Sequence, residues 1–163
     1  MFDIYTATQG RCSALAGESR AHGHTLTLYP DKSEPMLIFA DKERIEQVIT
    51  NIIGNAIKYT PDGGKIDVRV GMKNDRYYTI SVQDSGVGIP KEDLEHIFER
   101  FYRVDKSRST DAGGTGLGLS IAKDIIDAHG GSIDIESEYT KGTTVTITLP
   151  VDTRGTQINQ EEQ

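Results

Sequence analysis

Two asparagines and a lysine recur at helical spacing in the segment NIIGNAIKYT, residues 51–60. Asn51, Asn55 and Lys58 are four and then three residues apart, so on a helix they share one stripe. Tyr59 lies beside it. Such a stripe is often only a solvated helix face. Asparagine is a poor helix former, however, and its amide oxygen is a neutral ligand that suits Mg²⁺ when phosphate groups supply the negative charge. The pattern therefore favours a metal and phosphate site.

One carboxylate falls on the apolar side of an expected strand, RYYTISVQD, residues 76–84. The inward positions Tyr78, Ile80 and Val82 lead, at the same spacing of two, to Asp84. A buried carboxylate without a partner is costly. Two explanations stay open. Asp84 caps the bend that follows the strand, or it accepts hydrogen bonds from a ligand at the sheet edge.

A glycine cluster opens the apolar helix in GGTGLGLSIAK, residues 113–123. Gly114, Gly116 and Gly118 would let backbone N–H groups and the positive end of a helix dipole approach phosphate oxygens without interference from side chains. A flexible hinge is the alternative. The spacing is neither that of a P-loop nor G-x-G-x-x-G, so the motif predicts neither of those two nucleotide sites.

A basic cluster precedes the glycines, although the chain as a whole carries a net charge of -7. Its members are Arg100, Arg103, Lys106 and Arg108. The overall charge argues against a general nucleic-acid partner. The cluster is either a solvated loop or a set of cations for a polyphosphate, and its position before a helix N-terminus favours the second explanation.

The elements that must position these residues alternate between helices and strands. Helices are expected at residues 3–22, from the N-cap candidate Asp41 to about Tyr59, at 91–98, and from the glycine cluster to a C-cap at Gly130-Gly131. Strands are expected at residues 24–29, 65–72, 76–84, 132–138 and 143–150. This order predicts an α+β fold: a two-layer α/β sandwich with one mixed, mostly antiparallel sheet and helices on a single face.

The length of 163 residues suits one domain, expected over residues 1–152, with a disordered tail at 153–163. The single Cys12 cannot form an internal disulfide and is expected to serve packing. No apolar run reaches the length of a membrane span, and no signal peptide is recognisable. The chain is expected to be a cytoplasmic domain. The helix near residue 3 has no preceding cap, which suggests a piece of a longer protein.

Five motifs in order carry a family resemblance: NIIGNAIKYT, DSGVGIP, FERFYRV, GTGLGLSIAK and KGTTVTITLP. Together they resemble the catalytic and ATP-binding domain of bacterial sensor histidine kinases, a Bergerat fold of the GHKL superfamily. The resemblance covers residues 2–150. Within the family, FYRVDKSRS is most similar to the cell-wall-sensing kinases of Gram-positive bacteria.

The resemblance implies a Mg-ATP site with three catalytic residues, Asn55, Lys58 and Arg103. Asn55 would coordinate Mg²⁺, while Asn51 lines the same phosphate channel. Lys58 would pair with phosphate and Arg103 would reach the γ-phosphate. Tyr59 would pack near the nucleotide.

The resemblance also implies an adenine pocket in which Asp84 accepts the adenine amino group. Thr143 is in register with the inward side chains of its strand and would support the pocket through water. Gly86 and Gly88 would admit the base and ribose. Residues 105–113 would form a lid over ATP. The other implied nucleotide-binding positions are Ile89, Gly114, Thr115, Gly116, Leu117, Gly118 and Leu119.

One position discriminates the chemistry. Related ATPases of the gyrase and Hsp90 kind carry a glutamate four residues before the metal-binding asparagine, where it activates water. Here that position is Asn51, and an amide cannot act as a general base at neutral pH. The resemblance therefore implies phosphoryl transfer without appreciable ATP hydrolysis.

The phosphate acceptor in this family is a histidine followed by an acidic residue. His22, His24, His96 and His129 are followed by Gly, Thr, Ile and Gly. The acceptor is thus expected on a separate dimerisation domain absent from this chain, which should not autophosphorylate alone. The implied isolated domain is a monomer. The implied full-length protein is a membrane-anchored homodimer with a response regulator downstream.

The alternative is a nucleotide-regulated binding module of the anti-sigma type, which has the same fold and phosphorylates serine. The segment FERFYR and the long basic loop favour the histidine kinase.

Overall fold

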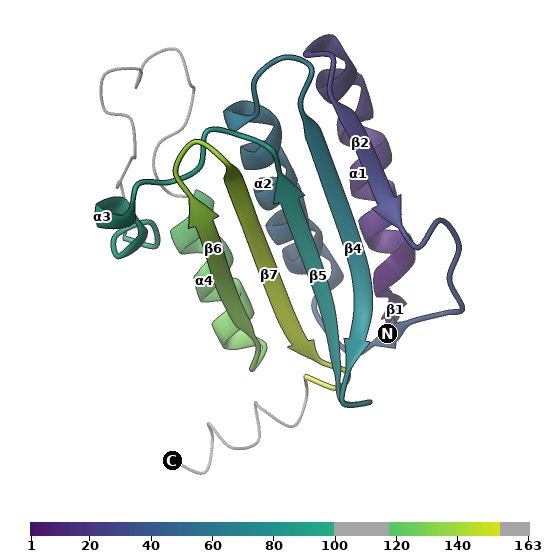
Figure 1. The fold of residues 1–163 in the computed structure, drawn as a ribbon. Coiled ribbons are helices and arrows are strands. Elements are labelled where there is room, and N and C mark those ends of the chain that lie inside the picture. Colours follow the sequence, from purple (N-terminus) through teal and green to yellow (C-terminus); the bar gives the residue numbers. More distant parts are fainter. Residues whose placement is uncertain (100–117, 154–163) are drawn as a thin grey trace.

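The computed structural model describes residues 1–99 and 118–153. Its helices are α1 (Ile4–Ala21), α2 (Lys42–Tyr59), α3 (Lys91–Leu94) and α4 (Gly118–Ala128). Its strands are β1 (Phe2–Asp3), β2 (Thr25–Tyr29), β3 (Leu37–Ile38), β4 (Lys65–Lys73), β5 (Tyr77–Asp84), β6 (Ser132–Glu138) and β7 (Gly142–Pro150) (Figure 1).

Five of the strands form one sheet in the order β2-β4-β5-β7-β6. β2 pairs with β4 in parallel, and every other pair in this sheet is antiparallel. A parallel pair needs a long crossover connection, which β3 and α2 provide here. The mixed, mostly antiparallel sheet expected from the sequence is confirmed. The two-residue strands β1 and β3, which pair with each other, were not expected.

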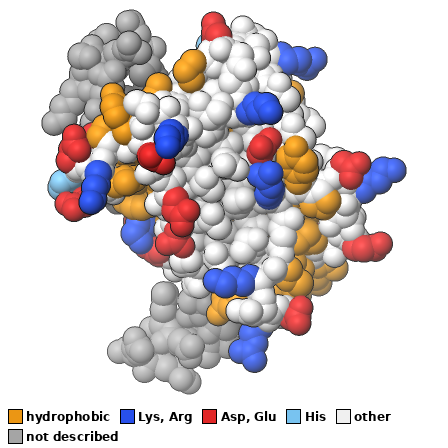
Figure 2. Space-filling model, viewed as in Figure 1, with side chains coloured by type: hydrophobic (Ala, Val, Ile, Leu, Met, Phe, Trp, Pro, Cys, Tyr) orange, Lys and Arg blue, Asp and Glu red, His pale blue; other side chains and the backbone are white. Residues whose placement is uncertain are grey.

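Helices α1, α2 and α4 cover one face of the sheet (Figure 1). The core lies between the two layers, and α2 contributes most to it because its apolar residues recur at helical spacing. The buried residues of α2 are Ile45, Val48, Ile49, Ile52, Ile53, Ala56 and Ile57. Each fully buried isoleucine or valine contributes about 1.5–3 kcal/mol relative to an exposed one. On the opposite face of the sheet, hydrophobic and charged side chains are scattered around a central area of other side chains and backbone (Figure 2).

Two aspartates fix where the long helices begin. Asp41 caps α2 by accepting a hydrogen bond from the Arg44 backbone N–H at 3.3 Å, as the sequence predicts. Asp3 caps α1 by accepting from the backbone N–H groups of Tyr5 and Thr6. Asp3 is therefore the cap of α1 rather than its first helical residue, so the expectation of an uncapped helix start was wrong.

Three further expectations can be compared with the structure. The short helix expected at 91–98 is limited to Lys91–Leu94 and continues as turns. Thr153, assigned above to the tail, is buried and donates its backbone N–H to the Phe39 carbonyl at 3.1 Å. Residues 154–163 lie outside the described residues. Cys12 is buried in the core as expected, and burial raises the pKa of its thiol to about 11.

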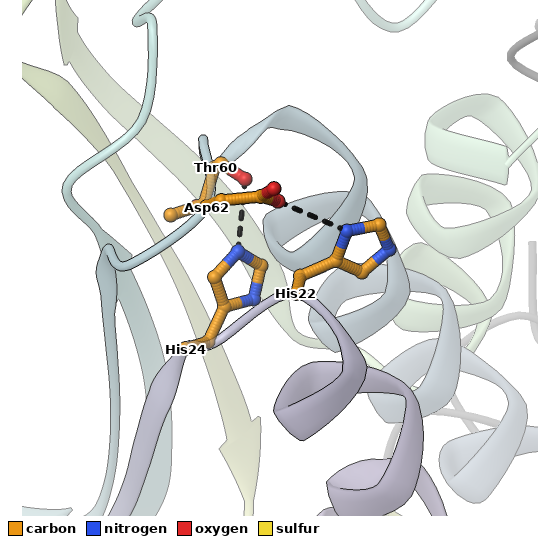
Figure 3. Close-up of polar contacts among 4 residues, drawn as sticks. All are labelled: His22, His24, Thr60 and Asp62. Atoms are coloured by element: carbon orange, nitrogen blue, oxygen red, sulfur yellow. Dashed lines mark hydrogen bonds and ion pairs between the residues drawn. The ribbon is translucent and has the colours of Figure 1, made fainter.

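A polar cluster holds the turn that follows α2. We call it the histidine corner; it comprises Ser19, His22, His24, Thr60 and Asp62. The His24 Nε2–H donates to the Thr60 carbonyl at 2.9 Å, and His22 Nδ1 lies 3.3 Å from Asp62 Oδ1 (Figure 3). The two imidazole rings stack with centroids 5.5 Å apart. His24 is only 6% exposed, so this corner fixes the end of α2 from the side of α1 and β2.

The other two histidines, His96 and His129, are partly exposed. His96 Nδ1 contacts the carboxylate of Glu99 at 2.8 Å. His129 follows α4 and donates Nδ1–H to the Ile125 carbonyl at 2.7 Å, while its Nε2 accepts the Asp41 backbone N–H at 3.2 Å. Within the described ranges, none of the helices has the length and apolar composition needed to cross a membrane.

Candidate active site

The last turns of α2 present the predicted polar stripe. Asn51 and Asn55 are half-buried, whereas Lys58 and Tyr59 are exposed. The Lys58 ammonium lies 5.3 Å from the centre of the Tyr59 ring, a favourable cation–π arrangement. The helix thus places two amides and one cation along the same side, next to an aromatic ring.

Asp84 ends β5 beside the start of β7. Its Cα partners are Ile66 on β4 and Thr143 on β7, so Thr143 and Asp84 lie side by side on the inner face. Burial raises the pKa of the Asp84 carboxyl, and hydrogen bonds from the backbone N–H groups of Gly86 and Thr143 oppose that rise. The inward carboxylate expected from the alternation is therefore present.

Both open explanations for Asp84 are compatible with this geometry. Its Oδ1 accepts the Gly86 backbone N–H at 2.9 Å, so it does cap the bend after β5. An ionised carboxylate offers about four lone-pair positions, which leaves capacity for a further donor.

The glycines after β5 are required by close approach of the protein's own backbone. A Cβ at Gly86 would lie 2.6 Å from the Tyr59 carbonyl oxygen. Gly88 has a φ of +71°, and a Cβ there would collide with the Glu138 carbonyl. The Val87 N–H also donates to the Tyr59 carbonyl at 3.3 Å. The end of α2, the bend after β5 and the β6–β7 hairpin therefore meet at one place.

Ser137 joins these segments, and the sequence analysis did not identify it. Its Oγ accepts the Ile89 backbone N–H at 2.8 Å, donates to the Gly142 carbonyl at 2.9 Å and lies 2.8 Å from Thr143 Oγ1. A signal for it exists in SIDIESE, because Ser137 has the same parity as the inward Ile133 and Ile135. It is a polar residue on the apolar side of a strand end, as Asp84 is.

We call Asp84, Ser137, Gly142 and Thr143 the base end. Asp84, Thr143 and Ser137 are successive cross-strand neighbours, so their side chains share the inner face. An open hollow of about 330 Å³ also lies at this end of the sheet, but it is lined largely by residues of the outer face, among them Gln83, Thr144 and Glu136.

The glycine-cluster helix is described from its first residue onward. Gly118 begins α4, Leu119 is half-buried, and α4 packs against α2. Within the described part of the chain, a Cβ at Gly118 would meet no atom within 4 Å. The remaining expectations fall outside the described residues: the lid 105–113 and Arg100, Arg103, Lys106, Arg108, Gly114, Thr115, Gly116 and Leu117.

The amino-acid sequence of this chain is similar to those of known proteins. Residues 40–153 match the family model of histidine kinase-, DNA gyrase B- and HSP90-like ATPases. The chain belongs to this family. Its histidine kinase branch accounts for the similar proteins: the sensor histidine kinase WalK of Bacillus subtilis is 49% identical over 122 residues, 74% of this chain and 20% of WalK. The kinase ArlS of Staphylococcus aureus is 47% identical over 138 residues, 80% of this chain and 30% of ArlS.

Solved histidine kinase structures share the fold. The catalytic domain of the histidine kinase ThkA superposes with a TM-score of 0.79 at 31% identity, covering 93% of this chain and 96% of that domain. Full-length ShkA in complex with AMPPNP gives a TM-score of 0.77 at 27% identity, covering 91% of this chain and 30% of ShkA. The resemblance inferred from the five motifs is therefore confirmed, and the chain corresponds to the catalytic, ATP-binding part of such kinases.

Proposed function

We propose that this domain binds Mg-ATP and donates the γ-phosphate to a histidine on a separate helical dimerisation domain of the same full-length protein. The observation that carries the proposal is the half-buried Asp84 beside Thr143, held next to the end of the asparagine-bearing helix by the hydrogen bond from Val87 to Tyr59. The complex of the similar protein ShkA with AMPPNP, an ATP analogue, supports it.

At the base end, the ionised Asp84 carboxylate is an acceptor and would receive a hydrogen bond from the adenine amino group. Because the carboxylate is partly desolvated, a donor that reaches it gains a charge-assisted hydrogen bond. Thr143 adds a hydroxyl beside Asp84 on the inner face. Ile89, Gly86 and Gly88 follow β5 and would line the ribose side of the nucleotide.

The α2 stripe would hold the metal ion and the phosphates. Among residues 1–99 and 118–153, no group of three or more His, Cys, Asp or Glu could hold a metal by itself. A neutral amide such as Asn55 binds Mg²⁺ well only when anionic oxygens complete the coordination, as phosphates do. The donor set therefore fits an ion that enters with the nucleotide. Asn51 and Lys58 would contact the phosphates beside it.

This donor set supports transfer rather than hydrolysis. In phosphoryl transfer the protein mainly positions the groups and stabilises charge, while bound Mg²⁺ neutralises the phosphate oxygens. Lys58 would stabilise negative charge that develops on the phosphates. Asn51 cannot take a proton from water, so no described residue of the stripe is a general base for hydrolysis. Arg103 would reach the γ-phosphate, and residues 105–113 would close over it.

The rest of the proposed protein lies beyond this chain. The chain spans 20% of the length of WalK and 30% of ArlS, both of which are named as histidine kinases. We propose that the other parts supply the acceptor histidine, a homodimer interface and a membrane anchor, with this domain on the cytoplasmic side. A response regulator is the proposed final acceptor, since the similar ThkA is known in complex with the response regulator TrrA.

A reconstituted transfer assay tests the proposal. The domain is mixed with its separately expressed dimerisation domain and with ATP labelled at the γ-phosphate. The expected product is acid-labile, base-stable phosphate on a histidine of the added domain, and the domain alone should remain unlabelled. Phosphoserine would instead indicate the anti-sigma type of module, and free phosphate alone would indicate an ATPase. The variant Asp84→Asn is the control for nucleotide dependence.

A further inference from the structure

We propose that Ser137 is a positioning residue that fixes the hydroxyl polarity of Thr143 and so makes the base end select a 6-amino purine over a 6-oxo purine. This inference deepens the proposed function and rests on it. Ser137 itself is not proposed to contact the nucleotide. It acts through the neighbouring hydroxyl, 2.8 Å away.

The hydrogen count at Ser137 decides the direction of each bond. A serine hydroxyl has one hydrogen and two lone pairs. The Ile89 N–H can only donate to it, and the Gly142 carbonyl, 2.9 Å away, can only accept from it. Ser137 therefore uses its hydrogen on Gly142, and the hydrogen between the two hydroxyls must come from Thr143. This is the assignment that gives all three contacts a hydrogen.

The consequence is that Thr143 has only lone pairs left to offer a ligand. Its cross-strand partner is Asp84, which when ionised also only accepts hydrogen bonds. Two acceptors therefore stand side by side on the inner face, where β5 ends and β7 begins. They favour an exocyclic NH₂ group or a water that donates, and they repel a carbonyl oxygen. Adenine carries an amino group at position 6, whereas hypoxanthine carries an oxygen there.

The backbone around Ser137 leaves the hydroxyl little freedom to rearrange. Gly142 has a φ of +135°, and a Cβ there would collide with the Asp84 carbonyl. Ile89 lies in the bend after β5, so the serine ties together the bend, the hairpin and the first residues of β7. A purely structural serine would also tie these segments. The two roles differ in one measurable respect, because only control of polarity changes the ratio of affinities for the two bases.

Titration calorimetry with ATP and with inosine triphosphate, which differs at the purine 6-position, measures that ratio in magnesium buffer. The wild-type domain should prefer ATP. In Ser137→Ala the Thr143 hydrogen is released and can point toward the base, so the ATP-to-ITP affinity ratio should fall on the order of tenfold. Ser132→Ala, an exposed serine on the same strand, is the matched control and should leave the ratio unchanged.

A double-mutant cycle sharpens the test. Thr143→Val removes the hydroxyl at nearly constant volume, so in that background Ser137→Ala should no longer change the ratio. If Ser137→Ala does not fold, Ser137→Cys, whose thiol is a weaker donor and acceptor, should lower the ratio in the same direction.

Three results would overturn the inference. The first is a folded Ser137 variant that weakens ATP and ITP equally. The second is a change of ratio that persists without the Thr143 hydroxyl. In the third, the wild-type domain binds neither nucleotide, which would overturn the proposed function itself and this inference with it.

Discussion

Helix α2 ends between two polar clusters. They differ in whether their polar side chains keep hydrogen-bonding capacity that the protein itself does not use. The histidine corner lies on the side of α1 and β2, and the base end lies on the side of β5 and β7. Both contain polar side chains that are largely withdrawn from water. Both lie beside the same few residues: the Thr60 carbonyl accepts from His24, and the neighbouring Tyr59 carbonyl accepts from Val87, in the bend that Asp84 caps.

The histidine corner uses its polar groups within the protein. His24 donates to Thr60, yet three of its buried atoms, His24 Nδ1, Ser19 Oγ and Thr60 Oγ1, have no hydrogen-bond partner within the described part of the chain. At the base end, by contrast, Ser137 and Thr143 bond to each other and Ser137 also bonds to the Gly142 carbonyl, while Asp84 keeps acceptor capacity beside them. The proposed function uses that remaining acceptor capacity, and it assigns no role in ligand binding to the histidine corner.

Replacing the central acceptor of the base end should have the largest effect. In Asp84→Asn an NH₂ group can face the adenine amino group, so one favourable bond becomes a repulsive contact. We expect ATP affinity to fall by at least about 100-fold, or about 2.7 kcal/mol. Titration calorimetry in magnesium buffer measures this loss. An unchanged affinity would place the adenine elsewhere.

The same substitution should not destabilise the fold. The direction of the pKa shift of Asp84 gives the expected sign of the change in the free energy of unfolding. Burial raises that pKa above its unfolded value, so the stability linked to the proton is complete below the unfolded pKa and is lost as the pH rises through the folded pKa. At pH 7 the charged carboxylate therefore costs stability. Asp84→Asn should leave the free energy of unfolding unchanged or raise it by up to about 1 kcal/mol, since the group keeps some solvent contact. Thermal melts of the free domain would reveal a contrary loss.

A substitution in the histidine corner should have the opposite pattern of effects, lowering the stability of the fold while leaving ATP affinity nearly unchanged. His24→Ala removes a buried ring and leaves the Thr60 carbonyl without its donor, so the free energy of unfolding should fall by about 2 kcal/mol. ATP affinity, measured well below the melting transition, should stay within about twofold of wild type. Urea denaturation and calorimetry measure the two quantities. A stable variant that loses ATP affinity would mean that this corner belongs to the site.

The sequence predicted the features of the base end and of α2 that depend on local periodicity. Alternation along β5 placed Asp84 inward because strand side chains repeat every two residues, and helical spacing placed Asn51, Asn55 and Lys58 on one stripe. The Asp41 cap of α2 and the left-handed Gly130 after α4 follow from equally local chemistry. At these positions the residue type and its neighbours along the chain contain the needed information.

The remaining features depend on segments that are distant in sequence. Gly86 is required by the Tyr59 carbonyl, and Ser137 has partners across the β6–β7 hairpin and in the bend after β5. His24 is buried because Thr60, across a crossover helix, offers it a carbonyl. The strands β1 and β3 have two residues each, too few to show any period. Only the assembled sheet brings such partners together.

A smaller effect is expected where the nucleotide site meets α2. If Asn55 holds Mg²⁺ as proposed, Asn55→Ala removes one neutral ligand from an ion that the phosphates also hold, so the gain in ATP affinity on adding Mg²⁺ should shrink by about tenfold, or about 1.4 kcal/mol. Titrating the domain with ATP in Mg²⁺ buffer and again in EDTA separates this gain from the affinity that adenine binding contributes. Gln47→Ala, an exposed amide on the same helix, is the control. An intact magnesium dependence would place the metal ion elsewhere.

The smallest effect is expected at the rim of the histidine corner. His22 and Asp62 lie 3.3 Å apart, but their side chains are 50% and 86% exposed, so the pair is well solvated. Asp62→Ala should change the free energy of unfolding by less than about 0.5 kcal/mol, and 1 M salt should remove most of that difference. The turn should persist, because the Gly63 N–H still donates to the His22 carbonyl at 3.1 Å and the buried His24–Thr60 bond is untouched. Urea denaturation at low and high salt measures the change. A loss as large as that of His24→Ala would show that the exposed His22–Asp62 contact, rather than the buried imidazole, holds the end of α2.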